Sequence, residues 1–368
     1  MGIKSRWRMS IGTNARRSVT EKSERDNTRE AAVAAFAASR FDNVSRMFSW
    51  VSLFALAAWA AGPMDPPSVR LFIKANQEFK VGRSSAAFSL LTRAAADGDV
   101  DAEYQLGVFY EHGIGRARPD LAEALRWYRK AAADGDRAAR NNLGYLYASG
   151  RGVIQDYAEA FKWYQLAASS GDAAAQSNLA GLYYRGRGIP RNPALAFRWY
   201  RAAALNGNAG AQSALGFLYQ KGIGVKSDDK KALKWYLAAA QSGHVFAQVK
   251  LGDMYEQGRG MAQKDYPKAF EWFHRASVNG RAVAQGKVGR FYELGLGVKK
   301  DLIEAYAWYV LAASAGDPIA RSNVKRLKLV LKPDQLMSAH KRARQLRAEL
   351  GIRSKGNKDW WVGDLWPW

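Results

Sequence analysis

The apolar residues between positions 102 and 316 recur at helical spacing. One such stretch places apolar side chains at i, i+3, i+4, i+7 and i+8, which is a single helix face: Ala124, Trp127, Tyr128, Ala131 and Ala132. A second kind of stretch has the spacing i, i+4 and i+8, as at Ala139, Leu143 and Tyr147. The two kinds alternate along the chain, so the pattern predicts pairs of amphipathic helices.

The pairs form a repeat, because one tryptophan column returns every 36 or 37 residues: Trp127, Trp163, Trp199, Trp235, Trp272 and Trp308. An aromatic residue follows each tryptophan, Tyr in five copies and Phe273 in the other. We expect both aromatic columns to pack in the core. Small residues at another fixed position, such as Gly107 and Gly144, are expected to allow close contact between helices.

Glycine and short polar residues mark where each predicted helix begins and ends. Glycines such as Gly135 and Gly171 stand where a helix ends in a left-handed residue. Asp136 follows as a candidate N-cap, whereas His244 and Arg281 replace the usual residue types in this column. A second cap column opens the other helix with Asp120, Asp156, Asn192, Asp228, Asp265 and Asp301. A glutamate three residues later in three repeats predicts a capping box there.

A single pair of short helices cannot bury its apolar face, but stacked pairs share a continuous core. The predicted fold is therefore all-α: a right-handed α/α solenoid built from helix pairs of about 36 residues. Six full copies cover residues 102–316, and residues 68–98 are interpreted as a degenerate first unit. Residues 317–350 are predicted to form a capping helix pair.

The consensus L-G-x-x-Y-x-x-G-x-G-V, followed by D-x-x-x-A-x-x-W-Y-x-x-A-A-x-x-G, resembles the Sel-one-like repeat (SLR), a relative of the tetratricopeptide repeat (TPR). One copy carries it at Leu143, Gly144, Tyr147, Gly150, Gly152, Val153, Asp156, Ala160, Trp163, Tyr164, Ala167, Ala168 and Gly171. The resemblance implies a TPR/SLR-like superhelix that serves as an adaptor or scaffold, usually in bacterial envelope or signalling systems and in eukaryotic protein quality control. It implies no chemistry.

The N-terminal region differs in composition from the repeats. Residues 1–46 form an arm with ten basic and five acidic residues, which we expect to be disordered, and residues 47–62 contain an uncharged apolar run. That run is short for a bilayer span and ends in a small-residue cleavage pattern. A cleaved signal peptide, a retained membrane anchor and a buried helix of a cytosolic protein all remain open. Either of the first two places the repeats outside the cytoplasm, in the periplasm or on the membrane.

The composition excludes several classes of site. The chain has no cysteine and four histidines, and its formal net charge is +23. No two histidines share a metal-ligand spacing, and no nucleophile or phosphate-loop motif is present. We therefore predict no catalytic residue, no cofactor and no metal.

Binding is expected at positions that vary between repeats. The residue before the leucine of each first helix is one such row, and by analogy with TPR solenoids it lines the concave surface. A peptide backbone can bind such a polar row, although ordinary solvated side chains give the same pattern. The row consists of Gln105, Asn142, Asn178, Ala214, Lys250, Lys287 and Asn323.

The middle of the solenoid is cationic, because no carboxylate occurs between Asp172 and Asp228. Five arginines there form the candidate anion site: Arg185, Arg187, Arg191, Arg198 and Arg201. An acidic peptide, an anionic lipid or a cell-wall glycan fits such a site, and a solvated basic face is the alternative. Nucleic acid is not expected, because no base-stacking aromatic alternates with these arginines.

The C-terminal residues 351–368 are rich in tryptophan. Trp360, Trp361, Trp366 and Trp368 follow a Gly/Lys/Ser linker outside any repeat. We expect this tail either to dock in a groove, on a partner or on lipid, or to pack against the last helices.

The sequence therefore predicts a scaffold of the bacterial cell envelope that binds a protein partner. A module for peptidoglycan or another anionic ligand is the second hypothesis, and an enzyme is the third. The sequence leaves the partner's identity and the oligomeric state open.

Overall fold

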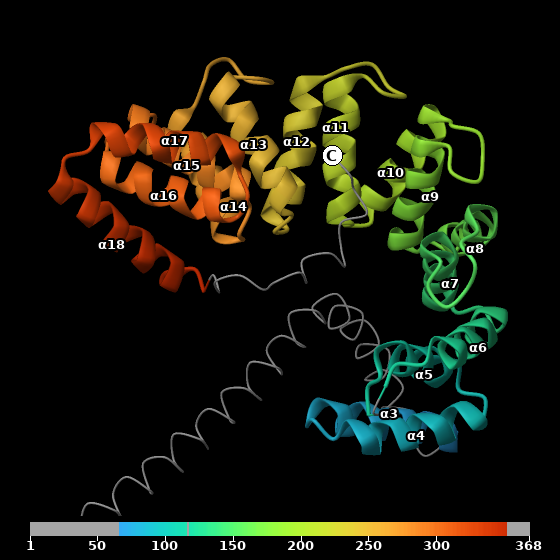
Figure 1. Cartoon of the computed structure of the whole chain (residues 1–368). Coiled ribbons are helices and arrows are strands. Elements are labelled where there is room, and N and C mark those ends of the chain that lie inside the picture. The colour runs from blue at the N-terminus through green and yellow to red at the C-terminus, as the bar shows by residue number, and fades with distance from the viewer. Residues whose placement is uncertain (1–65, 116–117, 352–368) are drawn as a thin grey trace, which may run out of the picture. The chain divides into compact units, whose positions relative to one another are not determined.

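The protein is described by a computed structural model covering residues 66–115 and 118–351, and every regular element in those ranges is a helix. The helices, labelled as in Figure 1, are α3 (Pro67–Lys80), α4 (Ser84–Ala96), α5 (Val100–His112), α6 (Leu121–Ala133), α7 (Arg137–Ser149), α8 (Tyr157–Ser169), α9 (Ala173–Arg185), α10 (Pro193–Leu205), α11 (Ala209–Lys221), α12 (Asp229–Gln241), α13 (Val245–Gln257), α14 (Tyr266–Val278), α15 (Ala282–Leu294), α16 (Leu302–Ser314), α17 (Pro318–Val330) and α18 (Pro333–Glu349).

Each helix from α3 to α16 packs mainly against its neighbours in the chain (Figure 1). We call the first helix of each repeat, from α5 to α15, the A helix, and the second, from α6 to α16, the B helix. At the C-terminal end α18 packs on α16, as α17 does. This neighbour-to-neighbour packing confirms the all-α repeat fold. The right-handed sense of the superhelix stays a prediction.

Glycine ends each A helix, because the chain must turn in a left-handed conformation. Gly150 caps α7 with φ 69°, and Gly152 follows with φ 73°. The second glycine also lies against the preceding repeat, since a Cβ atom on Gly152 would stand 2.8 Å from Leu121 Cβ. The turn between the two helices therefore needs glycine both for its backbone angle and for its contact.

The aspartate and asparagine caps that the sequence predicts are all formed. Asp99 accepts from Ala102 N at 2.8 Å, and His244 caps in the same way, its Nδ1 accepting from Ala247 N at 3.2 Å. Arg281 makes no side-chain cap bond. The predicted capping boxes are wrong, because the Asp156 amide donates to the Tyr147 carbonyl at 2.9 Å and is not available to a glutamate.

The core is built from the aromatic residue that follows each tryptophan. Tyr128, Tyr164, Tyr200, Tyr236, Phe273 and Tyr309 are all buried. Each of these rings except Tyr200 packs against a glycine of its A helix, and a Cβ atom on Gly144 would lie 2.6 Å from Tyr164 Cδ1. The predicted close contact of helices at this column is therefore present.

The tryptophan column meets the core prediction only in part. Trp272 and Trp308 are buried, but the tryptophans of the first four repeats are half-buried and pack at the rim of neighbouring clusters: Trp127, Trp163, Trp199 and Trp235. Consecutive helical residues point about 100° apart, so a helix that buries the tyrosine turns the tryptophan toward its edge.

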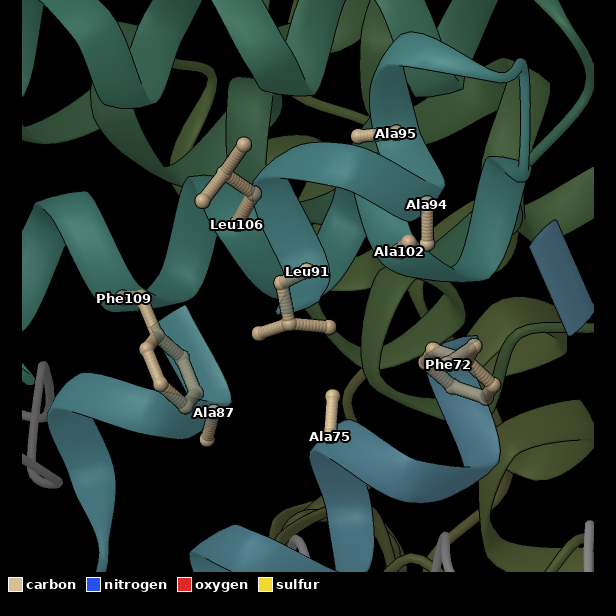
Figure 2. Packing of buried hydrophobic residues seen from close by; sticks show 9 residues of the cluster. All are labelled: Phe72, Ala75, Ala87, Leu91, Ala94, Ala95, Ala102, Leu106 and Phe109. Carbon is tan, nitrogen blue, oxygen red and sulfur yellow. The ribbon is translucent and has the colours of Figure 1, made fainter. Parts of the chain in front are cut away.

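Figure 2 shows the cluster at the N-terminal end of the solenoid. Phe72 from α3, Leu91 from α4 and Phe109 from α5 meet there with small alanines between them. The helices α3 and α4 thus supply the apolar face that α5 needs, as a first repeat would.

The predicted arm over residues 1–46, the segment 47–62 and the four tail tryptophans lie outside the described residues. None of the helices in the described part of the chain has both the length and the apolar character needed to span a bilayer.

Candidate partner-binding surface

The predicted polar row lies on successive A helices. Gln105, Asn142, Asn178, Lys250 and Lys287 are each half-buried, directly before a buried leucine or valine of the same helix. We call this row, together with the residues three and six positions after each member, the A-helix face. It differs in chemistry from one end to the other.

At its N-terminal end the A-helix face adjoins a network of tyrosines and one carboxylate. The Tyr128 hydroxyl donates to Glu111 Oε2 at 2.9 Å, and Arg151 Nη1 pairs with Glu111 Oε1 at 3.0 Å. The Asn142 side chain lies close to the hydroxyl groups of Tyr104 and Tyr128, where it partly offsets the rise in the pKa of each. Burial and then the Glu111 charge raise the pKa of Tyr128 well above its usual value, so this hydroxyl remains a donor.

In the middle of the face a hydrogen bond between two side-chain amides joins two repeats. Asn178 Nδ2 on α9 donates to Asn141 Oδ1 on α7 at 3.0 Å. The predicted residue Asn178 therefore contacts the neighbour of the predicted residue Asn142. Both side chains are only half-buried, so each retains polar surface for a ligand.

At the C-terminal end the predicted lysines take part in ion pairs between repeats. Lys287 Nζ on α15 lies 2.8 Å from Asp253 Oδ1 and 3.4 Å from Glu256 Oε2, both on α13. Lys250 lies 3.9 Å from Asp253 Oδ2, and Arg290 pairs with Glu256. These side chains connect adjacent A helices while remaining at the surface.

The carboxylates of this surface were not predicted from the sequence. Glu111, Glu256 and Glu293 each come six residues after a member of the row, and Asp253 comes three residues after Lys250. Each step of three residues turns about 60° around a helix, so residues at these offsets follow a slanted stripe in which each member neighbours the next. The sequence signal that could have identified these carboxylates is the opposite charge at the same offsets in the adjacent repeat.

The arginines of the α9–α10 loop face tyrosines. Arg187 Nη1 donates to the Tyr157 hydroxyl at 3.2 Å, and its guanidinium lies 5.3 Å from the centre of that ring. Arg191 Nε donates to the Tyr184 carbonyl at 3.1 Å. Both arginines are exposed, while Arg185 at the end of α9 is half-buried.

Comparison with equivalent loops shows what is unusual about Arg187. Arg151 and Arg259 hold the same place between the two loop glycines of their repeats, and each pairs at 3.0 Å with a carboxylate of the preceding repeat, Glu111 or Asp229. Tyr157 stands where that second pair has Asp229. Within the described residues, Arg187 accordingly makes no ion pair.

The other two predicted arginines lie on a helix. Arg198 and Arg201 are exposed on α10, three residues apart. The structure therefore divides the five-arginine site into a loop group and a helix group.

The histidines of the described residues pack against aromatic rings or contact polar groups within the fold. His274 lies between Phe270 and Trp308, with ring centres 5.8 and 5.6 Å away, and burial lowers its pKa. His340 Nε2 is 3.3 Å from the Tyr306 hydroxyl. Across residues 66–115 and 118–351, no three His, Asp or Glu side chains are grouped so as to hold a metal ion.

One comparison with a solved structure supports the fold, and a second match is weaker. A Sel1 repeat protein from Oxalobacter formigenes is 31% identical, with a TM-score of 0.59, and the match covers 66% of this chain and 96% of that one. The protective antigen c5321 of uropathogenic Escherichia coli, which displays an SLR fold, is 22% identical with a TM-score of 0.43, covering 78% and 88% of the two chains. None of the curated proteins compared with the chain matches it.

The family model of the Sel1 repeat matches six consecutive segments: residues 100–136, 137–172, 173–208, 209–244, 245–280 and 282–317. These segments coincide with the A and B helix pairs from α5 to α16. With more than half of its length in such matches, this chain belongs to the Sel1 repeat family.

Proposed function

We propose that this protein is an interaction scaffold of the bacterial cell envelope that binds a protein partner along the A-helix face. Sel1 repeat proteins generally mediate protein–protein interaction, and the family is typically non-enzymatic. The observation that carries the choice of surface is the half-buried row on successive A helices. The recurring tyrosine and glycine columns are buried, so they are not available to a partner.

The A-helix face supplies polar groups for such a partner. Its N-terminal part offers the side-chain amides of Gln105 and Asn142, and its C-terminal part offers alternating charges, as at Asp253 and Lys287. A row of hydrogen-bonding groups on adjacent helices suits an extended peptide, and the change in chemistry along the row sets its direction.

The partner surface is tested with matched variants of the full chain. Gln105→Arg introduces a long charged side chain on the A-helix face, and Gln165→Arg introduces the same change at an exposed position of α8. We expect capture of a discrete protein from membrane extracts to be lost with Gln105→Arg and retained with Gln165→Arg. Equal capture by both variants would reject the A-helix face.

The envelope location rests on the sequence, namely the apolar run in residues 47–62 after a basic arm. A reporter fused after Gly316 measures it directly. Alkaline phosphatase activity of the fusion is expected, whereas activity of a cytoplasmic reporter alone would contradict export.

A second candidate function is the binding of an anionic ligand at the α9–α10 loop, favoured by the unpaired charge of Arg187. The double variant Arg187→Gln/Arg191→Gln should bind vesicles containing phosphatidylglycerol, or isolated cell-wall sacculi, more weakly and with a flatter salt dependence. The control Arg198→Gln/Arg201→Gln removes the same charge from α10. If the two double variants weaken binding equally, net charge alone explains the binding and the loop is not a site.

A further inference from the structure

Two apolar side chains are exposed at the N-terminal ends of the last two A-type helices. Val283 on α15 is 57% exposed and Ile319 on α17 is 72% exposed, each two residues after its cap position. The two helix ends are adjacent, because a Cβ atom on Gly286 would lie 3.1 Å from Asp317 Oδ2. Val283 is one turn before Gly286 on the same side of α15. We call Val283, Ile319 and the turns that precede them the terminal edge.

The chain leaves its last helix beside this edge. Arg347, in the last turn of α18, donates to Ser314 Oγ at 3.2 Å, and Ser314 immediately precedes the turn that leads to Ile319. Leu350 is still packed against the C-terminal core. Eight residues, 351–358, separate Leu350 from the tryptophan-rich segment, and a fully extended chain of that length spans at most roughly 29 Å. The terminal edge is within reach of whatever follows residue 358.

The chemistry of the following residues complements the edge. Residues 359–368 contain four tryptophans and two aspartates, Asp359 and Asp364, and no basic residue. Arg281 lies in the edge, Arg321 and Arg347 lie beside it, and Asp317 is occupied in capping α17. Tryptophan rings bury large apolar areas, and the aspartates match the arginines around them.

We propose that residues 359–368 dock on the terminal edge of their own chain, with tryptophan rings covering Val283 and Ile319 and the aspartates directed toward the surrounding arginines. This inference is independent of the proposed function, because it involves neither the A-helix row nor the α9–α10 loop.

The natural absence of cysteine allows a direct test in the full chain. The pair Ile319→Cys/Gly363→Cys places one thiol on the edge and one in the tail. The control pair Leu329→Cys/Gly363→Cys uses the same tail thiol and an exposed position, 88% accessible, about 15 Å along α17. Under mild oxidation we expect the first pair to form an intramolecular disulfide at least tenfold faster than the control.

Each result decides the proposal. Equal rates for the two pairs would show an undocked tail and overturn it, and disulfides that form only between molecules would assign the edge to a second copy. Replacing all four tail tryptophans with alanine in the first pair should lower its rate to that of the control. Independently, deletion of residues 359–368 should increase hydrogen exchange in the α16–α17 turn, and unchanged exchange there would contradict docking.

Discussion

Glu103 on α5 is completely buried at a position where four later repeats carry glutamine. In those repeats the glutamine Nε2 donates to a carbonyl oxygen eight residues earlier, for example from Gln176 to Ala168 at 3.2 Å. A carboxylate cannot make this bond. Lys130 replaces it, because its Nζ atom lies 3.2 Å from the Ala95 carbonyl oxygen and 2.8 Å from Glu103 Oε1.

Removing the lysine should therefore be more damaging than removing the carboxylate. Lys130→Met leaves the buried Glu103 charge without a partner, a change that typically costs about 3–5 kcal/mol. The lysine side chain is 48% exposed, so water screens part of the loss and we expect a smaller cost, about 2–3 kcal/mol. Lys130 Nζ also lies 5.4 Å from the centre of the Trp127 ring, and methionine keeps a flexible apolar side chain at this position.

The carboxylate itself is replaceable. Glu103→Gln restores the residue type of the later repeats and its donor to Ala95, so we expect a change within about 1 kcal/mol. In the Glu103→Gln background Lys130→Met should also cost only about 1 kcal/mol, because no buried charge is left unpaired.

Urea unfolding followed by circular dichroism measures all four proteins of this cycle. Hydrogen exchange of the α5 amides locates the effect, which matters because repeat proteins need not unfold in one step. If Lys130→Met is equally destabilising with glutamate and with glutamine at position 103, the buried charge is not what Lys130 stabilises, and the reasoning fails.

Two further pairs of variants test the core by the same measurement. Tyr128→Phe should destabilise by about 1–2 kcal/mol, since it removes a donor from a buried carboxylate. Tyr236→Phe should be neutral or stabilising, because no residue of the described chain accepts from the Tyr236 hydroxyl. Equal losses in the two variants would contradict this. Gly144→Ala should destabilise by about 1–2 kcal/mol despite the better helix propensity of alanine, because its Cβ would lie 2.6 Å from a buried tyrosine ring. Gly181→Ala, whose Cβ would meet nothing closer than 3.6 Å, should stabilise, and a loss there would show that backbone rather than contact governs both sites.

The fold could be predicted from the sequence because its signals are local. A cap such as Asp156 and a glycine such as Gly150 act within one turn, and their repetition every 36 or 37 residues makes each assignment independent of the others. The burial of the tryptophans was less predictable. Trp127 and Tyr128 are adjacent and equally regular in the repeat, and only the packing of neighbouring helices decides which ring is covered.

The residues of the surface could be predicted from the sequence, but the side chains that they contact could not. The row from Gln105 to Lys287 was found because it varies beside a core position that is leucine or valine in every repeat. Its contacts were not found, since Lys287 meets Asp253 from the preceding repeat and Arg151 meets Glu111 forty residues away. Which residues of adjacent repeats meet depends on how far one repeat is shifted against the next. The sequence of a single helix does not specify that shift.

Departures from the repeated pattern are most informative when their compensation is considered. Glu103 departs from the glutamine column, and Lys130 of the same repeat supplies both the missing donor and the missing charge. Arg187 has the place of Arg259, but Tyr157 stands where the aspartate would be, so the guanidinium gains a ring and a hydroxyl but no negative charge. The Glu103 departure is paired with a charge of the same repeat and therefore contributes to stability. The Arg187 departure leaves a cation exposed at the surface, which is why we propose this loop, and not Glu103, as a place where an external anion binds.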